Sequence, residues 1–232
     1  MFTNKQTSLS FLGPEKVNYR FSGHETFPCR YAWLPKAFLG IEKKSTLFSI
    51  EEDAMVALGV GKNMERAIKF WIQVTDIASP AKGGGLANTN FGRALLAKDG
   101  FDPFLEDIRT LWLIHWKISS QVNEPLFAWN YLLNNYPHPE LNRTEVLQIF
   151  KKKSEQLERK LSPVTLEQHF DVFLHTYVPT RSRKGDIQED NLDCPLVELQ
   201  FIVKAGERNV DVAGKREPIY VFRWEDKPEI TP

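Results

Sequence analysis

The stretch FSIEEDAMVALGVGKNMERAIKFWIQVTDIASPAKGGGLANTNFGRALL, residues 48–96, carries the pattern that decides the fold. Ser49-Ile-Glu-Glu52 has the spacing of a capping box, in which a serine and a glutamate satisfy the free N–H groups at a helix start. This spacing predicts a helix that runs to Leu58. Gly59-Val-Gly61 then breaks the helix, because glycine tolerates the left-handed geometry that turns the chain.

A second helix is expected from Met64 to Ile77, with Asn63 as its N-cap. Its apolar residues recur on one face and its basic residues on the other, as in a helix that packs on one side only. The segment Ser79–Gly85 follows and ends in three glycines, which predicts the tip of a β-hairpin. Two helices, a tight turn and a glycine-tipped hairpin indicate a winged-helix module.

The second half of the chain repeats this order. Asn142 is placed to cap a helix at Arg143–Leu157, and Ser162-Pro163 is placed to start another that ends at Tyr177. The branched and aromatic segments Leu196–Val203 and Ile219–Trp224 then predict two hairpin strands. A second winged-helix-like module is the structural pseudo-repeat that this order favours.

These patterns predict a mainly α fold with small β-hairpins, of the α+β class, built from tandem winged-helix-like or helix-turn-helix modules. We expect two domains. Residues 1–118 would form an N-terminal winged-helix domain with a leading strand and helix. Residues 119–232 would form a helical second helix-turn-helix-like domain that ends in a β-hairpin.

Charge and cysteine usage exclude several classes of protein. Thirty basic and thirty acidic residues cancel, so any attraction to nucleic acid must be local. The two cysteines, Cys29 and Cys194, form no paired motif, which favours a reducing cytoplasm over a secreted disulfide scaffold. No signal peptide and no apolar run of ~20 residues is present, so we expect a soluble cytoplasmic protein without a membrane segment.

The strongest candidate interface is the basic face of the helix expected at 64–77. Side chains on an exposed helix face reach phosphates and base edges when the helix enters the major groove of duplex DNA. The expected DNA-binding residues are Lys62, Asn63, Arg66, Lys69, Gln73 and, on the hairpin, Lys82. The alternative is that these are solvated residues of a scaffold helix, because many winged helices bind protein instead.

Two other charged regions are weaker candidates for DNA contact. On the second helix-turn-helix, Glu167 and Asp171 would repel phosphate, so protein contact is expected there. The run Lys151–Lys153, with Arg159 and Lys160, is a basic cluster that either contacts nucleic acid or is a solvated helix face.

The segment Phe21-Ser-Gly-His-Glu-Thr-Phe27 and the following Cys29 are rich in reactive side chains. His24, Glu25 and Cys29 are of the types that bind a metal or activate a thiol, but no second cluster completes a four-ligand zinc site. A structural role is favoured, with Gly23 in a turn and His24 or Thr26 as a helix cap. No metal, no cofactor and no catalytic residues are therefore expected.

Four motifs resemble those of an uncharacterised bacterial and archaeal family of unknown function. They are FSGHETFPCRYAWLPKA at 21–37, LGVGKNMERAIKFW at 58–71, DPFLEDIRTLWLIHW at 102–116 and LDCPLVEL at 192–199. Genes of this family often lie beside genes resembling phosphoadenosine-phosphosulfate (PAPS) reductases, in loci linked to DNA sulfur modification (phosphorothioation) and phage defence. Members run longer, so the resemblance implies a C-terminally shortened chain and a PAPS-reductase-like sulfur-transfer partner.

The resulting hypothesis is a double-stranded DNA-binding accessory protein of a bacterial DNA-modification or antiviral defence system. It would act with the sulfur-transfer enzyme and would not itself be an enzyme. The first alternative is a protein-interaction subunit of that system that never contacts DNA. The second makes Cys29 a sulfur acceptor activated by His24.

Overall fold

The computed structural model describes residues 17–156, 161–179, 194–209 and 216–223. These residues form a mainly helical fold with two small antiparallel sheets, which confirms the expected mixture of helices and hairpins. The elements of the first half are α1 (Trp33–Lys43), η1 (Leu47–Ser49), α2 (Glu51–Leu58), α3 (Lys62–Val74), β1 (Ala78–Pro80), β2 (Leu86–Asn88), α4 (Asn90–Leu96) and α5 (Ile108–Ser119). Those of the second half are α6 (Phe127–Asn134), β3 (Glu140–Asn142), α7 (Arg143–Ser154), α8 (Pro163–Tyr177), η2 (Pro195–Leu199), β4 (Ile202–Asn209) and β5 (Arg216–Phe222).

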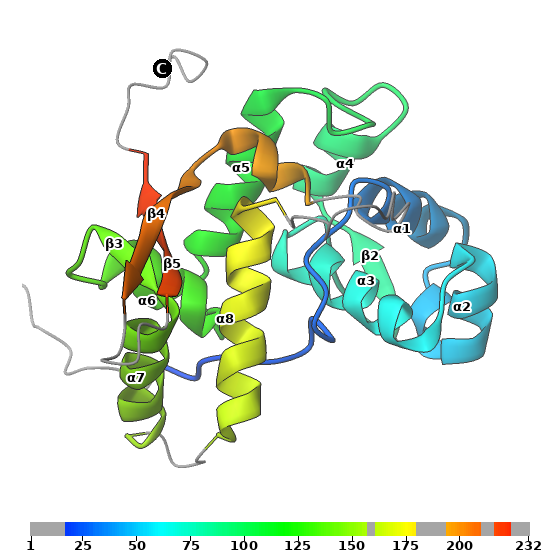
Figure 1. The fold of residues 1–232 in the computed structure, drawn as a ribbon. Coiled ribbons are helices and arrows are strands. Elements are labelled where there is room, and N and C mark those ends of the chain that lie inside the picture. The colour runs from blue at the N-terminus through cyan, green and yellow to red at the C-terminus, as the bar shows by residue number, and fades with distance from the viewer. Residues whose placement is uncertain (1–16, 157–160, 180–193, 210–215, 224–232) are drawn as a thin grey trace, which may run out of the picture.

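The two sheets lie in opposite halves of the molecule (Figure 1). Helices α1 to α4 surround the hairpin β1–β2, while α6 and α7 lie beside the sheet formed by β3, β5 and β4, in that order. Helices α5 and α8 lie between these two groups, and the short turn η2 packs against α5 and against α8. Among the described residues, no helix is long and apolar enough to cross a membrane.

Helix α3 is the centre of the first half because its apolar side faces both α1 and α2. Ile68, Trp71 and Ile72 are fully buried on that side. Helix α2 ends at Gly59, whose φ of 61° is left-handed and lets its N–H return to carbonyls of the last turn. The expected glycine turn between the two helices is thus confirmed.

The hairpin β1–β2 pairs Ala78 with Asn88 and Pro80 with Leu86. The Leu86 N–H also donates to the Ser45 carbonyl at 2.9 Å, so one backbone hydrogen bond joins strand β2 to the segment between α1 and α2. Beyond the hairpin, the Thr89 hydroxyl accepts the Gly92 N–H and caps α4.

The second half has the order helix, strand, two helices, hairpin; the two helices and the hairpin were expected, and strand β3 was not. Asn142 caps α7 through the Glu145 N–H, and Ser162 caps α8 with Pro163 as its first residue. These two caps were predicted and are confirmed. Strand β5 pairs with β4 along its length and with β3 on its other edge, from Glu140↔Val221 to Asn142↔Ile219.

One hydrophobic core runs through both halves of the described chain. Trp71 of α3 meets Trp129 of α6 edge to face, with ring centroids 6.0 Å apart. The segment before α1 also connects the two halves, because the Arg20 N–H donates to the Pro125 carbonyl and the Phe127 N–H donates to the Arg20 carbonyl. The division into domains at residue 118 stays a prediction.

Two predicted caps are wrong. Ser49 belongs to the 3-10 turn η1, so Ile50 is the N-cap residue of α2 and no side chain caps that helix. Gly61, extended at φ −77° and ψ 166°, is the N-cap residue of α3, which places Asn63 inside the first turn. Glycine is an acceptable N-cap residue without a side-chain bond, which suits the start of α3.

Two predicted strands also differ from the structure. The leading strand at Val17–Phe21 is a single bridge between Arg20 and Leu126. The first part of the segment Leu196–Val203 is the turn η2, where buried Leu196 and Leu199 are three residues apart, a spacing that suits a 3-10 turn. Strand β4 starts later, at Ile202. Arg159, Lys160 and Trp224 lie outside the described residues.

Candidate nucleic-acid interface

The candidate interface is built on the first two turns of α3. The buried side of the helix is fixed by Trp71, whose indole N–H donates to the Phe27 carbonyl at 2.9 Å. Because Ile68 and Ile72 are fully buried on the same side, the helix cannot rotate without losing core contacts. The opposite side therefore has a fixed orientation.

Lys62 and Arg66 are the exposed cations of this helix, one turn apart. Both bind the same carboxylate. Lys62 Nζ lies 2.9 Å from one oxygen of Glu51, the first residue of α2, and Arg66 Nε lies 2.6 Å from the other. The hydrogen bonds from Lys62 and Arg66 lower the pKa of the Glu51 carboxyl, and the Glu51 carboxylate raises the pKa of Arg66.

Glu51 belongs to the candidate interface and was missed by sequence reasoning. The sequence places it in a helix start, where an acidic residue is usual because it faces the positive end of the helix dipole. Its contact with Lys62 and Arg66 depends on the angle between α2 and α3, which no spacing in the sequence reveals. The result is a basic pair that already holds an anionic group.

Lys69 and Gln73 are less available than predicted. Lys69 Nζ donates to the Phe48 carbonyl at 3.0 Å, which pulls its stem across the turn before α2. Gln73 Nε2 donates to the Lys69 carbonyl one turn back at 2.8 Å. Both side chains are half-buried, so the structure divides the predicted face into an exposed first part and a partly covered second part.

Asn63 and Lys82 are both exposed, on different elements. Asn63 lies in the first turn of α3, beside Lys62. Lys82 lies at the hairpin tip, followed by Gly83, Gly84 and Gly85 with φ values of 99°, 100° and 77°. Such φ values favour glycine, so the tip has the geometry that a glycine triplet supplies.

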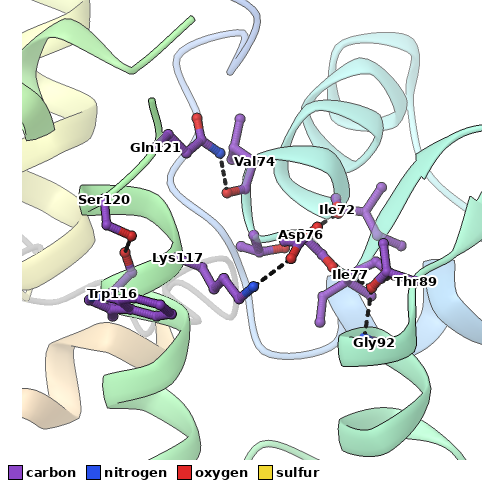
Figure 2. A network of polar contacts seen from close by, with 11 residues as sticks. Ile72, Val74, Asp76, Ile77, Thr89, Gly92, Trp116, Lys117, Ser120 and Gln121 are labelled. Carbon is purple, nitrogen blue, oxygen red and sulfur yellow. Dashed lines mark hydrogen bonds and ion pairs between the residues drawn. The ribbon is translucent and has the colours of Figure 1, made fainter. Parts of the chain in front are cut away.

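The far end of α3 is attached to α5, as Figure 2 shows. Lys117 Nζ lies 2.5 Å from a carboxylate oxygen of Asp76, and Gln121 Nε2 donates to the Val74 carbonyl at 2.6 Å. The Thr89 hydroxyl donates to the Asp76 carbonyl at 2.6 Å and so joins the hairpin to the same point. The helix, the hairpin and α5 therefore meet in one polar network.

His24 has a structural environment. The Ala128 N–H donates to His169 Nε2 at 3.0 Å, and His169 Nδ1 lies within hydrogen-bond distance of His24 Nε2, at 3.2 Å. Burial lowers the pKa of His24 to about 4 and lowers the pKa of His169 far below its usual value. Gly23, at φ 109°, makes the expected turn and lies against the Phe70 ring.

Cys29 is buried, and its thiol lies 3.8 Å from the Arg30 carbonyl. Burial raises the pKa of this thiol, so the thiolate needed for a sulfur-acceptor reaction is disfavoured. The hydrogen-bond partner of the His24 ring is His169, so the activation of Cys29 by His24 stays an untested hypothesis. Neither His24 nor Thr26 caps α1, whose N-cap residue, Ala32, makes no side-chain cap bond.

The described residues contain no group of three or more His, Cys, Asp or Glu that could hold a metal ion.

The corresponding face of α8 is acidic, as the sequence predicts. Arg143 of α7 binds Asp171, and its guanidinium also lies 3.7 Å from Glu167. One cation facing two carboxylates leaves this face negative. Lys151, Lys152 and Lys153 are exposed on the last turn of α7, away from this pair.

The chain belongs to the family described as protein of unknown function (DUF4007), whose pattern matches residues 21–232. It is similar to two solved structures, described as "SspB crystal structure" and "Magnesium ion-bound SspB crystal structure", with TM-scores of 0.74 and 0.72 and 26% sequence identity in both cases. Each similarity covers 90% of this chain and 61% of the SspB chain, so the chain spans less than two thirds of that protein. A comparison with curated protein sequences found no match.

Proposed function

We propose that this member of the DUF4007 family is a DNA-binding accessory protein of a bacterial DNA-modification or phage-defence system. In this proposal α1, α2, α3 and the hairpin β1–β2 form a winged-helix module that contacts duplex DNA. The β3–α7–α8–β4–β5 unit is a second module of the same kind. Catalysis belongs to a sulfur-transfer partner protein, which the family resemblance implies.

The observation that carries the proposal is the exposed pair Lys62 and Arg66 on the first two turns of α3. The pair already binds a carboxylate, and a phosphate oxygen presents similar charge and acceptor geometry to an Arg and a Lys. Asn63 stands beside the pair, and Lys82 stands at the tip of the adjoining hairpin. In such modules a helix lies in the major groove of DNA and the hairpin contacts the phosphate backbone of the DNA.

The similarity to SspB supports a place in a DNA-modification system, in agreement with the gene neighbourhood implied by the motifs. The magnesium ion named for one SspB structure is not part of the proposal. The described residues of this chain offer no cluster of His, Cys, Asp or Glu suited to a metal ion.

The test is duplex DNA binding by the double variant K62A/R66A over a range of salt concentrations. Loss of two phosphate contacts should weaken binding on the order of tenfold and reduce the slope of log K against log salt by about 1.8. The variant K151A/K152A removes the same charge from α7 and should leave the slope unchanged. Equal slopes for wild type and K62A/R66A would remove α3 from the interface.

A second candidate function is a protein-interaction subunit without DNA contact. The acidic first turn of α2, Glu51-Glu-Asp53, favours it, because this turn lies beside the pair on α3 and repels phosphate. For this function, the wild-type chain would co-purify with the sulfur-transfer protein after nuclease treatment. It would also fail to bind any duplex at low salt.

A further inference from the structure

The loop between α4 and α5, at the top of Figure 1, is held rigidly by its own hydrogen bonds. The carboxylate of buried Asp102 accepts the N–H groups of Glu106 and Asp107, each at 2.9 Å. The Phe101 N–H donates to the Ala94 carbonyl at 2.9 Å, which fastens the loop to α4. Leu105 is fully buried beneath it.

This loop exposes two phenylalanines to solvent. Phe101 is 89% exposed and Phe104 is 72% exposed, although the backbone on either side is fixed. A folded protein gains nothing by presenting two large apolar rings from a rigid loop to water. Aromatic rings that are already positioned are the usual anchors of protein interfaces, since little ordering entropy is lost when they bind.

A hollow of about 460 Å³ is lined in part by Leu105 and Glu106, the two residues that follow Phe104 in the chain. Its apolar lining comes from Leu105, Ile108 and Leu111, and Tyr31 stands against it. Glu106 and Glu198 supply its charge, and Tyr31 hydrogen-bonds to Glu198. Among the described residues that line the hollow, the charged ones are these two glutamates, so it is an acidic recess on the segment that follows the two exposed rings.

We propose that Phe101, Phe104 and this hollow form a docking surface for a protein partner. The partner would supply an apolar recess for the two rings and a lysine or arginine side chain for Glu106 and Glu198. Charge complementarity selects this occupant, because the two carboxylates would repel both DNA phosphates and anionic lipid headgroups. Resting on the proposed function, we assign this surface to the sulfur-transfer protein.

The experiment measures binding of the full chain to the purified sulfur-transfer protein by titration calorimetry after nuclease treatment. The variant F101S/F104S should weaken binding by roughly 30-fold or more, the loss expected for an interface anchor. The control V56S/V122S removes two other exposed apolar side chains, which are 84% and 85% exposed, and should bind as wild type.

A charge-reversal pair tests the hollow separately. E106K should weaken binding by about three- to tenfold, mainly through slower association, whereas E155K, just after the end of α7, should have no effect. Because these side chains are exposed, the melting temperatures of all variants should match that of wild type.

Three results would overturn the assignment. If the partner binds F101S/F104S as tightly as wild type, the docking surface is wrong while the partnership stands. If wild type does not bind the sulfur-transfer protein, the proposed partnership fails with it, although DNA binding by α3 remains separately measurable. If sedimentation shows wild-type self-association that F101S/F104S abolishes, the occupant is a second copy of this chain.

Discussion

His24 and His169 illustrate how a residue that looks reactive in sequence can be structural. Both rings are buried, stacked and hydrogen-bonded to each other, and Phe70 and Phe21 flank them. The sequence favoured a structural role for His24, and the structure adds its partner, 145 positions away in the chain. No local pattern identifies such a partner.

Stability should fall in acid because of this pair. The unfolded state of His24 takes up a proton near pH 6.5, whereas the folded state resists protonation until about pH 4. The neutral ring therefore contributes stability above pH 6.5 that is lost as pH falls toward 4, about 3 kcal/mol for this shift. Urea unfolding of wild type and H24Q between pH 7.5 and 4.5 measures it.

The variant H24Q should show a shallower fall in the free energy of unfolding with acid than wild type does. His169 and His115, whose pKa values burial also lowers, leave a residual slope in the variant. The control H138Q changes an exposed histidine and should follow the wild-type profile. A wild-type profile that is flat down to pH 4.5, or one that H24Q reproduces, contradicts this account of the pair.

At the scale of elements, prediction succeeded where a local interaction sets the structure. Ser162 followed by Pro163, and Asn142, are caps in both sequence and structure, because each side chain reaches an N–H within its own turn. Ser49 and Asn63 carry the same local signals. In the structure, Ser49 lies in the 3-10 turn η1, so α2 starts after it. The extended Gly61 is the N-cap residue of α3, so that helix starts before Asn63.

The amphipathic division of α3 was predicted only in part. The buried side follows the helical repeat, and Ile68, Trp71 and Ile72 are inside as expected. On the other side, Lys69 reaches back to the Phe48 carbonyl and Glu51 joins Lys62 to Arg66. Both contacts come from the packing of neighbouring elements, which the repeat of one helix cannot reveal.

The contact between α2 and α3 makes Glu51 a competitor of phosphate. Neutralising it in E51Q should tighten duplex DNA binding by roughly three- to tenfold at moderate salt, because Lys62 and Arg66 are then free. E52Q removes the same charge from the exposed next residue of α2 and reports the effect of net charge alone. Fluorescence anisotropy with one labelled duplex measures both variants.

If E51Q and E52Q tighten DNA binding equally, the effect comes from the net charge of the protein, and the contact of Glu51 with Lys62 and Arg66 has no separate effect on binding. A weaker complex with E51Q would mean that Glu51 holds the pair in its binding geometry. That result would contradict the competition argued from the two ion pairs.

At the scale of the whole molecule, the candidate DNA face is connected by packing to the loop between α4 and α5 that carries Phe101 and Phe104, here called the aromatic loop. Lys117 ties Asp76, at the end of α3, to α5, the helix that begins just after the aromatic loop. The apolar core continues from α3 through Trp129 into α6 and α8. A protein of this kind could hold DNA at one surface and a partner enzyme at another without rearranging.

In the proposed tandem arrangement, the two modules differ in charge. The second residue of α3 is Asn63, beside a basic pair, and the second residue of α8 is Val164, on the helix whose exposed carboxylates meet Arg143. Equivalent positions in similar units thus lie in opposite electrostatic surroundings. We therefore assign DNA contact to the first module alone.

The most direct test places a photo-reactive benzoylphenylalanine at Asn63 or at Val164 in the full chain bound to duplex DNA. Both positions are exposed and lie in the first turn of their helices, so the two variants differ mainly in the module that they report on. The account predicts cross-linking to DNA from position 63 and none from position 164. A DNA-bound chain that cross-links only from position 164, or from neither position, would contradict it.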